Sequence, residues 1–232
     1  MKKVRTHLED RVLPSYTKGE EIFNMVSHIA GGALAIAALV LCVIFAVIHT
    51  DAWGVVGAAI YGSTMVVLYA MSSIYHGLKP EMPKKVFQVI DHCTIYFLIA
   101  GTYTPVSFAL EPFWRNSIIA GMWICTTVAL IIHVIWISAP RWLYVIVYII
   151  FGVSGVAFMG LFWISPYAGP AVVVLLAAGG ACYIAGAIVY ALRKPDPWPK
   201  VFGFHEIFHC GTVAGYACHM VAIYMVIVQL WP

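Results

Sequence analysis

Seven long apolar segments dominate this sequence and restrict it to a membrane-spanning fold. Each is about 22 to 28 residues long, and about 20 apolar residues suffice for a helix to cross the hydrocarbon core of a bilayer. Of the 232 residues, 62% are hydrophobic and 10% are charged, whereas a soluble domain carries roughly 25% charged residues. The predicted spans are Phe23–Ile48, Trp53–Tyr75, Phe87–Leu110, Ser117–Ser138, Trp142–Ile164, Ala171–Leu192 and Phe204–Trp231.

The fold class that follows is an all-α integral membrane protein, a bundle of seven transmembrane helices. We assign residues 1–20 to a cytoplasmic N-terminal segment and residues 21–232 to the seven-helix membrane domain. The stretch up to Thr17 is predicted to be a short surface element. Thr17 and Glu20 have the spacing of a capping box, which predicts that the first helix begins just before the membrane.

The distribution of Lys and Arg predicts the orientation. Twelve of the thirteen lie in the N-terminal segment or in loops on the same side of the predicted bundle, and only Arg115 lies on the other side. Cytoplasmic loops carry such an excess of positive residues. The N-terminus is therefore predicted to be cytoplasmic and the C-terminus to be outside, which is the reverse of a G-protein-coupled receptor and excludes that class.

Small residues and cysteines fall inside the apolar segments. Gly211 and Gly215 have the small-xxx-small spacing that lets two membrane helices pack closely. All six cysteines lie in apolar stretches and none in a loop, which argues against an extracellular disulfide framework.

Ionisable residues near the predicted helix ends converge at one depth. They are His76, Asp91, His205, Glu206 and His209. Each lies within the first or last turns of its span on the cytoplasmic side; Asp91, for example, is about one turn or 6 Å into its helix. Such groups are costly inside a membrane unless they are paired or bound, so the cluster is a candidate functional site.

Two further sets of polar residues lie at this level. Glu21, Asn24 and His28 follow one face of the first helix at spacings of three and four residues. Ser72 lies one turn before His76 in the second helix.

The histidine spacing favours a divalent metal. His205 and His209 lie one above the other on a helical face, and His76 offers a third nitrogen. Three protein ligands and a water, with Asp91 near the water, would be the pattern of a catalytic zinc site. Taken singly, each histidine could also be a packed, hydrogen-bonded residue. His205 to His209 also match the H-E-x-x-H motif of zinc proteases, with Glu206 as general base. We find no distal Asp motif to complete such a site, and we favour Glu206 as a helix-start carboxylate at the positive end of the helix dipole.

The remaining buried histidines are given structural roles. His133 and His219 lie deep in their spans, where a polar contact between helices is expected. His92 follows Asp91 but points off its face, so it is assigned at most an indirect role at the site.

The motifs together resemble the hemolysin III branch of the progestin and adipoQ receptor family. The resemblance covers the chain from about Thr17 to the end. It rests on Glu21-x-x-Asn24-x-x-Ser27-His28, Ser72-x-x-Tyr75-His76-Gly77, Asp91-His92, Gly101-Thr102-Tyr103-Thr104-Pro105 and His205-x-x-x-His209.

The resemblance implies a zinc ion, Zn²⁺, near the inner leaflet. By family pattern its ligands match His76, His205 and His209, with Asp91 acting through a water and Ser72 beside it. The wider group includes alkaline ceramidases and adiponectin receptors, which suggests hydrolysis of lipid amides. Bacterial members are named for a haemolytic activity and linked to membrane lipid homeostasis, so we expect a bacterial inner (plasma) membrane location.

Three classes of function remain open at this point. The first is a zinc-dependent hydrolase that acts on lipid amide or ester bonds, the second a non-enzymatic membrane sensor with structural zinc, and the third a pore-forming cytolysin. A pore would need a polar stripe along whole spans, whereas the polar residues here cluster at one level. The expected partner is a membrane lipid as substrate, with no nucleic acid and no protein partner predicted.

Overall fold

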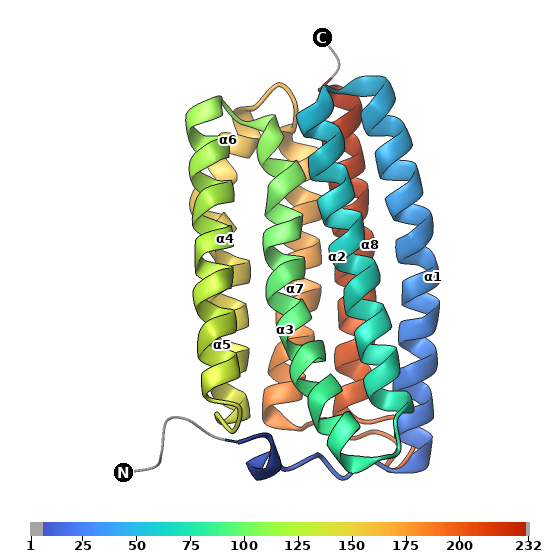
Figure 1. Ribbon diagram of the computed structural model, residues 1–232. Coiled ribbons are helices and arrows are strands. Elements are labelled where there is room, and N and C mark those ends of the chain that lie inside the picture. Colours follow the sequence, from blue (N-terminus) through green and yellow to red (C-terminus); the bar gives the residue numbers. More distant parts are fainter. Residues whose placement is uncertain (1–6, 231–232) are drawn as a thin grey trace.

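A computed structural model describes residues 7–230 and shows a bundle of long helices (Figure 1). There is no sheet in this range; the only β-type pairing is an isolated bridge between Trp198 and Phe202. The α-helices are α1 Lys18–His49, α2 Ala52–Gly77, α3 Glu81–Val106, α4 Pro112–Ile135, α5 Arg141–Val153, α6 Met159–Ile164, α7 Gly169–Leu192 and α8 Phe204–Gln229. Short 3₁₀ helices are η1 Leu8–Asp10, η2 Ser107–Ala109 and η3 Ser154–Phe158.

The structure confirms an all-α membrane fold. Within residues 7–230, six helical segments are long and apolar enough to cross a membrane: α1, α2, α4, the continuous stretch Arg141–Ile164, α7 and α8. The third predicted span, α3, is not among them; its first half carries Lys84, Lys85 and Asp91. It nevertheless runs alongside α2 and α4 in the bundle (Figure 1). A count of seven crossings therefore stays a prediction.

One end of the bundle is strongly basic. The connections α2–α3, α4–α5 and α7–α8 and the segment before α1 gather at the lower end of Figure 1. Nine of the ten Lys and Arg residues between positions 7 and 230 lie at this end, hereafter the basic end, and Arg115 lies at the opposite end. Lys2, Lys3, Arg5 and Trp231, which also entered the sequence predictions, fall outside the described residues.

Local sequence signals position α1 and α8. The predicted capping box is confirmed, since the Thr17 side chain accepts from the Glu20 amide and the Glu20 carboxylate accepts from the Thr17 amide. The small residues of α8 pack against α7 as predicted: a Cβ on Gly211 would lie 3.0 Å from the Cys182 carbonyl oxygen, and one on Gly215 would lie 2.9 Å from that of Gly179. This contact fixes α8, which carries two of the candidate ligands.

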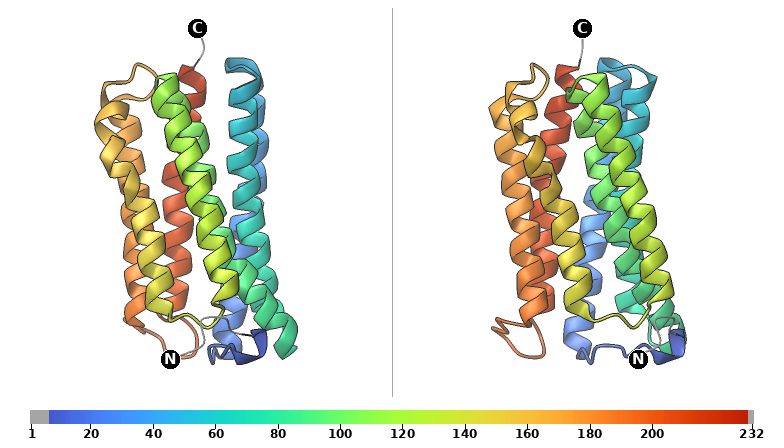
Figure 2. Two further views of the ribbon diagram at one scale, coloured as in Figure 1. Left: turned by 60° about the vertical axis from the view of Figure 1, so that its left-hand side comes forward. Right: turned by 90° about the vertical axis from the view of Figure 1, so that its left-hand side faces the viewer.

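The segment before α1 lies at the surface, as Val12 at 88% exposure shows, but it also contributes one buried side chain. It crosses the basic end beneath the helices (Figure 2), and Arg11 is only 7% exposed. The reason is tertiary: the side chain reaches acceptors on α3 and on the α4–α5 connection, which no local pattern reveals.

Candidate metal centre

Three buried histidines from two helices meet near the basic end. His76 is in the last turn of α2, and His205 and His209 are in the first two turns of α8. Their ligand atoms all lie within 4.8 Å of one another. The Nε2 atoms of His76 and His205 are 3.3 Å apart.

The hydrogen-bond partners of two of these histidines suit a metal site. The Nδ1–H of His76 donates to the Glu21 carboxylate at 2.7 Å, which leaves a lone pair on Nε2. The Ser27 hydroxyl donates to the Asn24 carbonyl, so its oxygen can accept from Nδ1 of His209 at 3.4 Å and leave the other nitrogen as a ligand.

One pair of ligand atoms has the separation expected at a zinc ion. Two nitrogens bound tetrahedrally to one zinc at about 2.0–2.1 Å lie roughly 3.3 Å apart, which matches the separation of the His76 and His205 Nε2 atoms. The residues present therefore fit a zinc ion. Partners on the outer nitrogens, such as the Glu21 carboxylate, are the usual way of fixing ligand tautomers.

The polar face predicted on α1 supports this cluster residue by residue. Glu21 binds His76, and its other oxygen pairs with Lys84 Nζ at 2.9 Å. The His28 ring stacks on that of His209 with centroids 3.6 Å apart. The third member of the face, Asn24, reaches α8 through Glu206. All three residues of the face thus contact the ligands or the helix that carries two of them.

Glu206 caps α8. Its Oε1 accepts from the Asn24 amide at 2.6 Å, and its Oε2 accepts from the Gly203 backbone N–H at 2.8 Å. Both oxygens are engaged in fixing the start of the helix. This geometry corresponds to the helix-start carboxylate favoured from the sequence, and it leaves no free oxygen for a protease-like general base.

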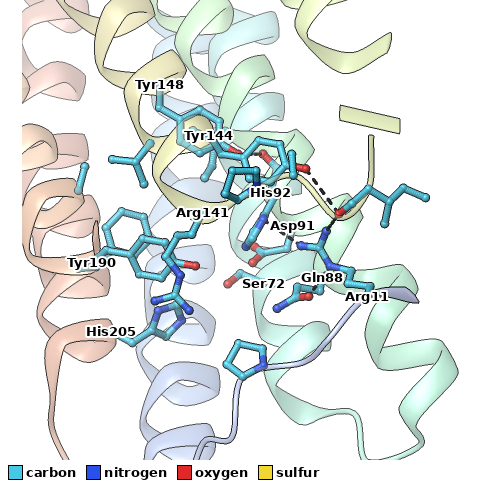
Figure 3. Close-up of a pocket in the computed structure, with 18 of the residues that line it drawn as sticks. Arg11, Ser72, Gln88, Asp91, His92, Arg141, Tyr144, Tyr148, Tyr190 and His205 are labelled. Atoms are coloured by element: carbon cyan, nitrogen blue, oxygen red, sulfur yellow. Dashed lines mark hydrogen bonds between the residues drawn. The ribbon is translucent and has the colours of Figure 1, made fainter. Parts of the chain in front are cut away.

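A cavity of about 890 Å³ opens beside the histidines. Asp91 lines it, with Ser72 next to it and His205 on the opposite wall (Figure 3). The Ser72 hydroxyl is within hydrogen-bonding reach of the Asp91 carboxyl. The cavity therefore brings together both predicted catalytic residues, His28 and two of the predicted ligands.

Several residues of the cavity wall were not predicted. Arg141 lies over the Tyr190 ring at 4.5 Å from its centroid and extends toward His205 in Figure 3. Gln88 and Arg11 form the wall beside Asp91. A sequence signal existed for Gln88, because Lys84, Gln88 and Asp91 have helical spacing and make one polar stripe. Nothing local marks Arg11 or the pairing of Arg141 with Tyr190.

Tyr16 closes the site from the N-terminal side. Its ring stacks on that of His205 with centroids 4.8 Å apart. Burial raises the pKa of its hydroxyl well above the ordinary value, so the group stays a neutral phenol next to the histidines. It too escaped the sequence predictions.

The other histidines behave differently from one another. His219 Nε2 contacts the Leu176 carbonyl oxygen at 3.1 Å, which is the predicted polar contact between helices. His133 stacks on Tyr144 with centroids 4.2 Å apart, and its nitrogens have no hydrogen-bond partner within residues 7–230. The predicted polar contact is therefore replaced there by ring stacking. His92 lines the cavity with Asp91, although it was expected to point away.

These features define a class: a helical integral membrane protein with a buried three-histidine cluster beside a carboxyl-lined cavity at its basic end. Comparison with known proteins agrees. A family described as "Haemolysin-III related" matches residues 16–220. "Hemolysin-3 homolog" of Bacillus subtilis (strain 168) is 32% identical over 206 residues, covering 87% of this chain and 92% of that relative. "Hemolysin-3" of Bacillus cereus is 32% identical over 200 residues, covering 85% and 87%.

The chain belongs to the haemolysin-III-related family. The family match begins just before α1 and includes all three histidines of the cluster. It leaves out the segment that holds Arg11.

Proposed function

We propose that this protein is a zinc-dependent hydrolase that acts on lipid amide or ester bonds at the inner leaflet of a bacterial plasma membrane and contributes to membrane lipid homeostasis. One observation carries the proposal. The ligand atoms of three buried imidazoles lie within 4.8 Å of one another, and two of these imidazoles, His205 and His209, line the same cavity as the Asp91 carboxyl group.

A bound zinc ion would supply Lewis acidity toward the lipid carbonyl and lower the pKa of a water molecule. The chain supplies the rest. His76, His205 and His209 would hold the ion, and Glu21 and Ser27 orient His76 and His209. Asp91 takes the proton of the attacking water as general base and returns it to the leaving amine or alcohol, so that water adds across the cleaved bond. The Ser72 hydroxyl orients the Asp91 carboxyl.

The cavity suits a lipid in size. Ligand sites of roughly 300–1,000 Å³ enclose drug-sized molecules, and this cavity of about 890 Å³ is in that range. Its wall combines apolar side chains such as Leu68 and Ile95 with polar groups near the basic end. An acyl chain would lie along the apolar wall with its head group toward that end. By the positive-inside rule we assign the basic end to the cytoplasm.

A second candidate is a non-enzymatic sensor in which zinc is structural. The contacts Glu21–His76 and Asn24–Glu206 join α1 to α2 and α8, so an ion at the histidines would tie three helices together. The carboxyl in the cavity favours catalysis over this alternative. A pore-forming cytolysin is the least favoured function, because a pore needs polar residues along whole spans and those of this site lie at one end of the bundle.

Mass spectrometry of lipids incubated with the purified protein tests the proposal. A hydrolase yields a fatty acid or other cleaved product that a metal chelator suppresses. Asp91→Asn should keep its zinc and lose turnover by about 10²- to 10⁴-fold, the usual contribution of a general base. Glu111→Gln, at the exposed carboxyl before α4, is the matched control and should be fully active. If the wild type gives no chelator-sensitive product, or if Asp91→Asn has unchanged turnover, the non-enzymatic sensor with structural zinc becomes the favoured function.

A further inference from the structure

The segment before α1 forms part of the cavity wall. Asp10, Arg11, Val12 and Pro14 all line the cavity. The segment runs across the basic end, at the level of the connections between the helices (Figure 2). The segment therefore covers part of the cavity on the basic side.

Arg11 holds the segment in place through all three nitrogens of its guanidinium group. Nε donates to Gln88 Oε1, Nη1 donates to the Ile137 carbonyl at 2.6 Å, and Nη2 is 3.3 Å from His92 Nδ1 (Figure 3). Gln88 and His92 lie on α3, and Ile137 lies in the α4–α5 connection. The planar guanidinium group of arginine can donate to several fixed acceptors at once. The single ammonium nitrogen of lysine cannot reach all of them.

The same side chain places a positive charge beside the candidate general base. Gln88 and His92 flank Asp91 on α3, and the charge of Arg11 acts on the Asp91 carboxyl. A buried carboxylate is strongly disfavoured without an opposite charge nearby. Arg11 is the cation that acts on it within the described chain. A second tether is weaker: Lys85 Nζ donates to the Glu9 carbonyl at 3.1 Å.

We propose that Arg11 is a positioning residue of this site. It fixes Gln88 and His92 around Asp91, places a positive charge near the Asp91 carboxyl, and holds residues 8–16 as the wall on the basic side of the cavity. The part that concerns Asp91 rests on the proposed function. The part that concerns the wall does not.

Thiol labelling tests the wall without any need for turnover. Ala187 lines the cavity from α7, and Ala187→Cys gives a small probe there. Its labelling by a membrane-impermeant maleimide is followed by peptide mass spectrometry, with native Cys42, a buried thiol of α1, as internal reference. Adding Arg11→Gln should raise the rate at the probe about tenfold, because charge-assisted hydrogen bonds that close the segment are lost.

Two controls make this result decisive. Lys18→Gln removes a positive charge from an exposed position at the start of α1 and should leave the rate unchanged. Arg11→Lys keeps the positive charge but loses the planar guanidinium group, and it should give an intermediate labelling rate. A probe that reacts equally fast with and without Arg11→Gln, while Cys42 stays protected in both, would overturn the proposed wall.

Turnover tests the effect on Asp91. With a lipid substrate found by the chelator experiment, Arg11→Gln should lower kcat by about tenfold or more with a smaller change in KM, and Arg11→Lys should recover most of it. An unchanged kcat in Arg11→Gln would overturn the positioning role. If the wild type cleaves no lipid but labelling still rises, the wall stands and the hydrolase proposal fails.

Discussion

The two ends of the bundle use polar side chains in different ways. At the end opposite the basic one, hydrogen bonds are mostly local or between neighbouring helices, as in the Asp51 cap of α2 and the bond from Trp123 to Thr104. At the basic end, they join residues far apart in the chain: Asn24 binds Glu206, 182 positions away. Hydrogen bonds at the first end cap the helices and support their packing, whereas those at the basic end hold the candidate site together.

This difference teaches where function lies in a membrane bundle. Polar groups of a membrane helix must be satisfied wherever they lie, so a hydrogen bond alone marks nothing. Charged groups from several helices at one depth are costly and need a compensating role. Glu21, Lys84 and His76 form such a group, and the far end has no counterpart among the described ion pairs.

The largest effect expected concerns which end faces the cytoplasm. A reporter that works only outside the cytoplasm, fused after Pro232, should be active, because positive residues are retained inside. Activity of a cytoplasmic reporter at the same position would reverse the assignment of the basic end. It would also place the cavity in the outer leaflet.

The next largest effect concerns zinc content, which should depend on histidines at the basic end and not on those toward the other end. Purified protein should hold about one zinc per chain, and His209→Ala should lose it because one of three ligands is gone. His219→Ala, on the same helix toward the other end, should retain it, since its ring contacts the Leu176 carbonyl and the Tyr183 ring. Atomic emission analysis measures both. Full zinc in a variant with alanine at His76, His205 and His209 would refute the ligand set.

A smaller effect is expected from the partner of a ligand. Glu21→Gln removes the carboxylate that fixes the His76 tautomer, and such changes weaken metal binding by roughly 10- to 100-fold. Competition with a chromogenic chelator measures the affinity. Glu81→Gln removes an exposed carboxylate of α3 that pairs with Lys85, and it serves as control. Equal affinities for the two variants would show that Glu21 is not part of the centre.

The smallest effect belongs to the opposite end. Thr104→Val leaves the Trp123 indole N–H, which donates to it at 3.1 Å, without its acceptor. Stability in detergent should fall by about 0.5–1.5 kcal/mol, with zinc content unchanged. Thr127→Val, which loses only a bond to the Trp123 carbonyl, should cost less. Loss of zinc in Thr104→Val would show that the two ends are coupled.

The sequence by itself determined the helices and the depth of the polar residues. Apolar segments, the Thr17–Glu20 capping box and the Gly211–Gly215 face are local patterns, and backbone hydrogen bonding in a membrane permits few alternatives to helices. Helical spacing likewise placed Glu21, Asn24 and His28 on one face, and the ends of the spans brought His76, His205 and His209 to one level. The composition of α3, in contrast, left the number of crossings open.

Only the tertiary structure decided which of these residues touch. The pairing of Glu21 with His76, the two bonds of Glu206 and the cavity beside Asp91 depend on how helices rotate and pack against one another. Arg11 is the clearest case, because it precedes every apolar segment and no periodicity includes it. Its place is set by acceptors on α3 and after α4, more than 70 residues further along the chain. Contacts at such separations are fixed by packing and charge across the whole bundle, which local spacing does not encode.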